Sequence, residues 1–155
     1  MILLYAVAAV IAALALSPWS VGVTPHASLW QRLLYPFFHA SILHAVCNLW
    51  CIIAMERYYC LSPWLYLTAY VIAVTVPDVV LTAQPTVGLS GVCFALMGLL
   101  TWIVARRLYW TAWVVAFMAV GFIMPAVNAW LHVYCYTVGV IIGIFNAPII
   151  NVKGS

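Results

Sequence analysis

Charged side chains are scarce in this sequence, with five Lys and Arg residues and two Asp and Glu residues in a chain of 155. Soluble domains carry about a quarter charged residues, whereas here the charged share is 5% and the hydrophobic share is 69%. A chain so poor in charge cannot form a soluble globule. No carboxylate lies near the histidines in the sequence and no His-Glu-x-x-His run occurs, so the zinc-protease signature is absent.

Cysteine patterns that indicate disulfide frameworks or redox sites are also missing. No Cys-x-x-Cys occurs, and most cysteines fall inside apolar segments, where cysteine usually fills space. The five cysteines are Cys47, Cys51, Cys60, Cys93 and Cys135. The formal net charge of +3 is small. We interpret the basic residues as setting the orientation of the protein in a membrane. We expect no nucleic acid as a partner.

Long apolar segments separated by proline and polar residues fill the chain. A membrane-spanning helix needs roughly 20 apolar residues, and a spanning barrel would instead show alternating polarity. We place spans at residues 2–17, 36–55, 63–81, 89–105, 108–126 and 131–150. The sequence therefore predicts an all-α polytopic membrane protein, a single domain over residues 1–155 built as a bundle of six transmembrane helices.

Basic residues fall mostly on one side of the expected bundle. Arg57, Arg106, Arg107 and Lys153 follow the second, fourth and sixth spans, whereas Arg32 lies in the opposite set of loops. The positive-inside rule then places both termini in the cytoplasm, in what we expect to be a bacterial cytoplasmic membrane. The first apolar run lacks the basic start of a signal peptide, so we expect it to be retained as a span.

A serine between glycines stands at the start of the fourth apolar segment, in the run Gly88-Leu89-Ser90-Gly91. A polar side chain at membrane depth is costly unless it has partners. If Arg106 marks the cytoplasmic boundary, Ser90 lies about 24 Å away along a helix and stays below the outer surface. Irregular backbone at that depth is tolerated only beside protein or a water-filled cavity. We therefore expect Ser90 to line a wet pocket open to the outside.

His132 is the candidate base for this serine. It begins the sixth segment, at a depth comparable with that of Ser90, and a small-residue ridge of Cys135, Gly139 and Gly143 follows it. Such ridges let helix backbones approach closely in membranes, as a short serine–histidine hydrogen bond requires. A neighbouring base that takes the hydroxyl proton makes a serine nucleophilic.

The second segment carries further polar groups at helical spacing. His44 and Asn48 are four residues apart and share a helix face, whereas His39 lies about 140° around the helix from His44. Paired donors beside Ser90, together with the Ser90 backbone N–H, would stabilise the oxyanion of an acyl-transfer intermediate. His39 is expected to have a different, supporting role. Phe94 lies one turn beyond Ser90 on the same face, where it can pack on the imidazole and fix its orientation.

Each of these features also has a simpler interpretation. Gly-x-Ser-Gly is more often a packing motif in membrane helices, and His44 and Asn48 can simply hydrogen-bond between helices. Histidines in spans can also ligate haem or a metal. A haem protein would absorb near the Soret region when purified, and a colourless preparation would argue against it. All of these groups together, in the outer half of the spans, are much harder to obtain from packing alone.

Three segments resemble the rhomboid family of intramembrane serine proteases. Residues 38–48 share the His-x4-His-x3-Asn spacing of the family's second span, residues 88–98 are similar to its nucleophile segment, and residues 132–139 are similar to its base segment. The run Trp30-Gln31-Arg32 is similar to the tryptophan–arginine element that precedes the second span. The resemblance covers essentially the whole six-span core.

The resemblance implies a catalytic dyad of Ser90 and His132 with no acidic third member. It implies that His44, Asn48 and the Ser90 amide form an oxyanion hole and that Gly88 belongs to the loop lining the first substrate pocket. It further implies cleavage of single-span transmembrane proteins near the outer face, a preference for small residues before the bond, and no metal or cofactor. We therefore expect an active protease embedded in a lipid bilayer. The sequence makes no prediction of oligomeric state.

Two residues differ from the family's usual pattern. Cys135 stands where glycine usually follows the base by three residues, and Phe94 replaces a frequent tyrosine. The first outward loop is also shorter than in well-known bacterial members. The bulkier Cys135 leads to an alternative, a catalytically inactive rhomboid-like protein that binds membrane clients without cutting them. A fluorophosphonate serine probe separates the two, because only an active enzyme is labelled at Ser90.

Overall fold

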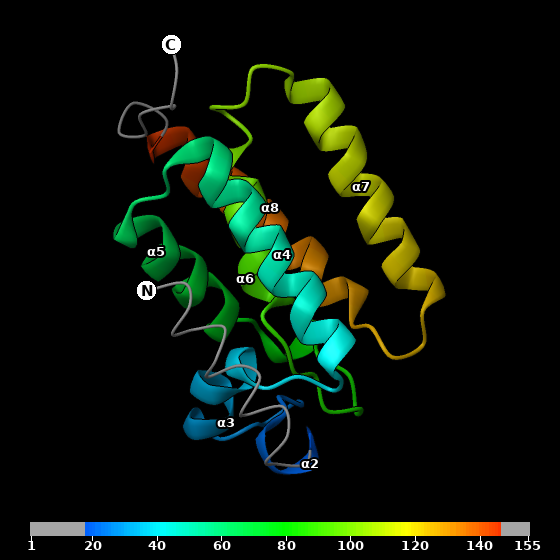
Figure 1. The fold of residues 1–155 in the computed structure, drawn as a ribbon. Helices are drawn as coiled ribbons and strands as arrows, with labels where there is room; N and C mark the ends of the chain where they lie inside the picture. Colours follow the sequence, from blue (N-terminus) through cyan, green and yellow to red (C-terminus); the bar gives the residue numbers. More distant parts are fainter. Residues whose placement is uncertain (1–17, 147–155) are drawn as a thin grey trace.

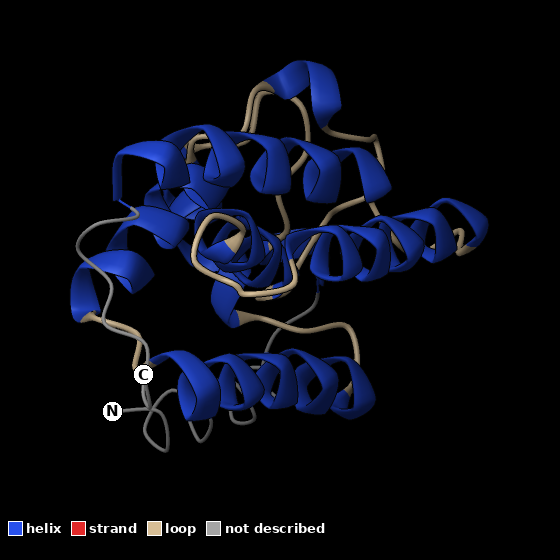
Figure 2. Ribbon diagram, turned by 90° about the horizontal axis from the view of Figure 1, so that it is seen from above, coloured by secondary structure: helices blue, strands red, loops and turns tan. Residues whose placement is uncertain are grey.

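Residues 18–146 are described by a computed structural model as an all-helical protein with no strand among them (Figures 1 and 2). Short elements come first: α2 (Pro18–Val21), α3 (Leu29–Leu34) and a 3₁₀ turn, η1 (Tyr35–Phe37). The longer helices are α4 (Ile42–Tyr59), α5 (Pro63–Val74), α6 (Ser90–Leu100), α7 (Arg107–Ile123) and α8 (Ala129–Asn146), with the 3₁₀ turn η2 (Asp78–Val80) between α5 and α6.

The helices α4 to α8 correspond to the second to sixth predicted segments, and the first, residues 2–17, lies outside the described residues. The second begins at Ile42 rather than at residue 36, because Pro36 lies in η1 and the Ser41 side chain caps α4. The third ends at Val74 rather than at residue 81, shortly before Pro77, which has no N–H to continue a helix.

A helix that spans a membrane needs both length and an apolar composition. Among residues 18–146, none of the helices taken singly is long and apolar enough to cross a membrane, whereas Leu29–Phe37 and Ile42–Tyr59, which meet at a bend of 80°, pass that test as a pair.

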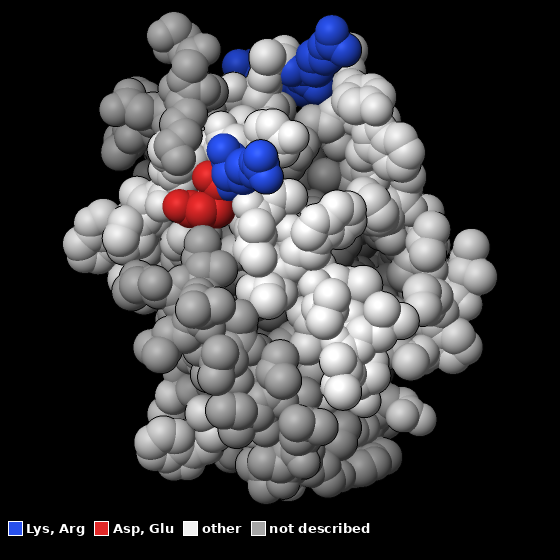
Figure 3. Space-filling model, in the orientation of Figure 1, with Lys and Arg blue, Asp and Glu red and all other residues white. Residues whose placement is uncertain are grey.

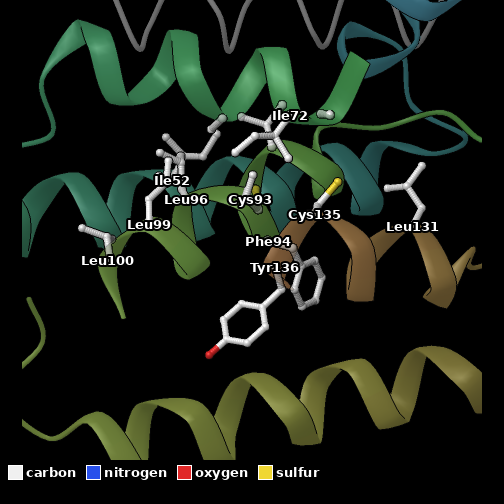
Figure 4. Close-up of a cluster of buried hydrophobic side chains, with 14 of the residues drawn as sticks. Ile52, Ile72, Cys93, Phe94, Leu96, Leu99, Leu100, Leu131, Cys135 and Tyr136 are labelled. Atoms are coloured by element: carbon white, nitrogen blue, oxygen red, sulfur yellow. The ribbon is translucent and has the colours of Figure 1, made fainter. Parts of the chain in front are cut away.

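Helix α6 forms the centre of the fold. Its sequence is apolar all round, which is typical of a buried helix, and nine of its 11 residues are buried. It packs most extensively against α8 and next against α5, whereas α4 contacts it much less and α7 lies at the edge, mainly against α8 (Figure 1). Leu96, Leu99 and Leu100 join α6 to Ile52 of α4 and Ile72 of α5 in the main hydrophobic cluster (Figure 4).

Helices α6 and α8 touch backbone to backbone. A Cβ atom on Gly139 of α8 would lie 2.4 Å from the Ala95 carbonyl oxygen, and one on Gly98 of α6 would lie 2.3 Å from the Tyr136 carbonyl oxygen. Both distances are too short for any side chain, so glycine is required at the two positions. This contact holds the helix that starts at Ser90 against the helix that carries His132.

Cys135 does not separate the two helices. It is fully buried, at 0% exposure, and its side chain points toward α5, whereas Phe94 and Tyr136 extend toward α7 (Figure 4). The thiol therefore extends toward α5, one helical turn before the Gly139 contact, and the backbones of α6 and α8 still meet at Gly139.

The two acidic residues hold connections in place. Arg32 donates hydrogen bonds to the Asp78 carboxylate and, at 2.6 Å, to the Val76 carbonyl, which ties α3 to the segment after α5. Glu56 near the end of α4 accepts a hydrogen bond of 2.8 Å from the Tyr66 hydroxyl on α5. Both acidic side chains are thus engaged in structural contacts.

Between residues 18 and 146, the basic residues other than Arg32 lie at one end of the molecule. On the face shown in Figure 3, the charged side chains lie toward the end where α4 finishes and α7 begins, and the rest of the described surface in that view is uncharged. Arg57 stands in the last turn of α4, and Arg106 and Arg107 stand at the start of α7. The start of α6, with Ser90, points away from this basic end.

Candidate active site

Ser90 and His132 meet in the interior of the helical bundle. Ser90 is the first residue of α6 and His132 lies in the first turn of α8. The Nε2 atom of His132 is 2.8 Å from the Ser90 hydroxyl oxygen, and the imidazole is only 8% exposed. With Nε2 as the acceptor, the hydroxyl donates its proton along this hydrogen bond, which is the arrangement that activates a serine.

The imidazole also lies against an aromatic ring and near α7. Phe94 stacks on His132, with ring centroids 4.3 Å apart and planes inclined by 19°. A Cβ atom on Gly121 of α7 would lie 3.8 Å from the Nδ1 atom of His132. The chain has only two acidic residues, and the contacts of Asp78 and Glu56 are with other groups. The pair is therefore a dyad without a carboxylate.

His44 and Asn48 converge on Gly88, two residues before the serine. Gly88 has a φ of +125°, in the region that favours glycine. A Cβ atom there would lie 2.5 Å from Cε1 and 2.8 Å from Nε2 of His44, and 3.5 Å from Nδ2 of Asn48. Gly88 is thus required both by its backbone conformation and by the imidazole beside it.

This convergence leaves hydrogen-bond donors without partners. Asn48 is buried, and its Nδ2 atom makes no hydrogen bond. Buried polar groups in folded proteins are nearly always paired, so an unpaired buried donor calls for an explanation. The Ser90 N–H is in the first turn of α6, where backbone N–H groups have no partner within the helix. Both donors are suited to an oxygen atom of a ligand, and a helix start favours negative charge.

His39 contacts the backbone that leads into Ser90. Its Nε2 atom accepts a hydrogen bond of 3.3 Å from the Leu89 N–H, and the side chain is 4% exposed. Its ring meets that of His44 edge-on, with centroids 5.2 Å apart. The two histidines therefore touch different parts of the site. The expectation that both lie on one helix about 140° apart was wrong, because His39 precedes α4, which begins at Ile42 after the Ser41 cap.

Two residues that the sequence did not single out fix the loop before the serine. The Tyr35 carbonyl accepts a hydrogen bond of 3.0 Å from the Gly88 N–H, and its buried hydroxyl donates at 2.8 Å to the Ala73 carbonyl. The Asn128 side chain donates at 3.4 Å to the Thr86 hydroxyl. Neither residue belongs to a recognisable motif; a polar side chain in an apolar sequence was the only signal available.

Metal ligands do not gather in the part of the chain that the structure describes, where no three His, Cys, Asp or Glu side chains come together as a metal site requires. The candidate site is thus composed of a hydroxyl, imidazoles, an amide and backbone N–H groups. This composition fits acyl-transfer chemistry, in which a nucleophile, a base and oxyanion donors act together.

In residues 18–146 the protein is an all-helical bundle in which a half-buried serine is hydrogen-bonded to a buried histidine. A family model described as the Rhomboid domain matches residues 26–149. A search of curated proteins found no match. Because the matched region is most of the chain, the protein belongs to the rhomboid family, whose members are integral membrane proteins and generally intramembrane serine proteases.

Proposed function

We propose that this protein is an intramembrane serine endopeptidase that cleaves single-span transmembrane proteins near the outer membrane face. The observation that carries the proposal is the 2.8 Å hydrogen bond between the Ser90 hydroxyl and Nε2 of His132. Membership of the rhomboid family supports it, because the family is generally proteolytic. The hydrogen-bond donors around Gly88 would stabilise the negative charge that develops on the substrate's carbonyl oxygen.

The first half of the reaction transfers the acyl group to the enzyme. Neutral His132 accepts the hydroxyl proton while the Ser90 oxygen attacks the peptide carbonyl carbon. The resulting oxyanion accepts hydrogen bonds from the Ser90 N–H, Asn48 Nδ2 and His44. The tetrahedral intermediate then breaks its C–N bond, and the imidazolium gives its proton to the leaving amine. An ester between Ser90 and the amino-terminal product remains.

Water completes the cycle. A water molecule that enters from the outer side gives a proton to His132 as it attacks the ester carbonyl, and the same donors stabilise the second oxyanion. Breakage of the ester C–O bond returns the proton to Ser90 and releases the new carboxyl terminus. Only a locally unwound substrate helix exposes its carbonyl, because helical backbone groups are already hydrogen-bonded.

The charge distribution supports an orientation for the enzyme. The end that carries Arg57, Arg106 and Arg107 would face the cytoplasm, as the positive-inside rule requires, and Ser90 would lie toward the outer face. We propose a six-span bundle in a bacterial cytoplasmic membrane, with the predicted span at residues 2–17 and both termini cytoplasmic. Gly88 would line the first substrate pocket.

Cleavage by a serine variant tests the function directly. Full-length wild type, Ser90→Ala and Ser62→Ala are reconstituted in liposomes with a single-span substrate that has alanine and glycine at the outer end of its span. We expect cleavage by wild type and by Ser62→Ala, whose lost hydroxyl caps α5, and none by Ser90→Ala. Undiminished cleavage by Ser90→Ala would remove Ser90 as the nucleophile.

The same proteins distinguish the inactive alternative. A fluorophosphonate probe phosphonylates an activated serine, so wild type should be labelled and Ser90→Ala should not. A wild-type protein that is folded in liposomes, binds a membrane client and is never labelled would instead be a client-binding protein without protease activity.

Loss of the Asn48 donor is expected to slow the chemical step. Asn48→Ala should lower kcat by about 10²–10³-fold, the usual effect of removing one oxyanion donor. KM should change little, because the oxyanion forms only in the transition state. Cys47→Ala is the control, since Cys47 is the exposed neighbour on α4. A fall in kcat no larger than that of the control would show that Asn48 does not stabilise the oxyanion.

A further inference from the structure

The two groups of donors in the proposed oxyanion hole come from helices that touch each other little. The Ser90 N–H belongs to α6, whereas His44 and Asn48 belong to α4. Helix α4 packs on α6 far less extensively than α8 does. The donors must nevertheless converge on a single oxygen atom, so their relative position needs a tie other than the packing of the two helices.

Residues just before α4 supply such a tie to the residues just before α6. The Tyr35 carbonyl accepts the Gly88 N–H at 3.0 Å, and His39 Nε2 accepts the Leu89 N–H at 3.3 Å. The carbonyl of Leu89 in turn accepts the Cys93 N–H at 3.0 Å, the first hydrogen bond of α6. The backbone at Leu89 is therefore fixed on one side to the chain that enters α4 and on the other to α6.

We propose that His39 is a positioning residue that, through the acceptor Nε2, sets the start of α6 and its Ser90 N–H relative to the α4 donors. This inference rests on the proposed protease function. Because Nε2 accepts a hydrogen bond, His39 acts as the neutral ring with its proton on Nδ1. His39 does not contact the reacting atoms; it acts through Leu89.

The structure also permits a competing role, because the His39 ring packs edge-on against His44 at 5.2 Å between centroids. Two substitutions distinguish the role of the hydrogen-bond acceptor Nε2 from the role of the ring packing. His39→Gln keeps an acceptor at the end of a side chain but loses the ring. His39→Phe keeps the aromatic ring but has no acceptor. His26→Gln is the matched control, since the His26 side chain is 92% exposed.

The variants are compared as full-length proteins in liposomes by kcat and KM on the single-span substrate and by the rate of fluorophosphonate labelling, with thermal unfolding measured alongside. For His39→Phe we expect kcat and the labelling rate to fall about 10²-fold, since small misplacements of reacting groups have effects of that size. KM should be nearly unchanged. His39→Gln should recover most of the rate, and His26→Gln should match wild type.

Three results would overturn the proposal while leaving the proposed function intact. If His39→Phe retains more activity than His39→Gln, the ring packing matters and the acceptor does not. If KM rises while kcat is kept, His39 affects substrate binding. Should His39→Phe fail to fold, His39→Leu replaces it; if that variant also unfolds while His39→Gln is stable, the hydrogen bond serves stability alone. An inert wild type would instead defeat the proposed function itself.

Discussion

Replacement of His132 by alanine is expected to lower kcat for a single-span substrate by a factor on the order of 10⁴–10⁶, as loss of the base does in other serine hydrolases. The Ser90 hydroxyl is then left without an acceptor for its proton, because His132 Nε2 is its partner at 2.8 Å. The fluorophosphonate labelling rate should fall in parallel. The measurement is single-turnover cleavage in liposomes, with thermal unfolding to confirm that the variant is folded.

Two further variants are measured for comparison with His132→Ala. His26→Ala removes an exposed imidazole that lies beside Asp78, and it should cleave at the wild-type rate. The double variant Ser90→Ala with His132→Ala should be no slower than either single variant, because residues that act as a unit are not additive. A His132→Ala protein that cleaves and labels within about tenfold of wild type would contradict the dyad.

A single methyl group at Gly139 is expected to have the largest effect on stability. The added Cβ would lie 2.4 Å from the Ala95 carbonyl oxygen, which is backbone and cannot rotate away. Overpacking of this kind destabilises proteins by typically 1–3 kcal/mol. The displacement should also separate Ser90 from His132, since both sit on the same helix pair. Gly139→Ala should therefore unfold at a lower temperature and be labelled more slowly.

Gly121→Ala provides the same substitution without the collision. A Cβ atom at Gly121 on α7 would meet its nearest neighbours at 3.4 and 3.5 Å, an ordinary contact distance. Alanine is favoured over glycine within a helix by about 1 kcal/mol, so this variant should be as stable as wild type or more stable. Equal unfolding temperatures for the two variants would mean that α6 and α8 can move apart without cost.

The parts of the site that could be predicted are those set by spacing along a helix. His44 and Asn48 share a face because they are four residues apart, and the structure places both beside Gly88. The ridge that includes Gly139 predicted close approach of two helices, and the structure leaves no room for a Cβ atom at Gly139 between α6 and α8. Helical periodicity and runs of small residues are local features of the chain, so they can be recognised in the sequence.

The parts that could not be predicted depend on which loops meet. The hydrogen bond from Leu89 to His39 joins residues 50 positions apart, and nothing in either segment indicates its partner. The same is true of Tyr35, whose carbonyl reaches Gly88. The direction in which Cys135 points was also open, because a bulkier residue on a small-residue ridge can face either neighbour. The direction of the Cys135 side chain depends on how α5 packs against α6 and α8.

The dyad has an energetic consequence for the speed of the proposed enzyme. In a triad the acid stabilises the imidazolium that forms when the base takes its proton. Here the ring is buried, and neither acidic side chain of the chain is its partner, since Asp78 and Glu56 contact other groups in residues 18–146. The cation is therefore poorly compensated at the moment of bond formation. If the proposed proteolysis takes place, we expect its chemical step to be slow, so that a membrane protein whose backbone is exposed only briefly would leave the site uncut.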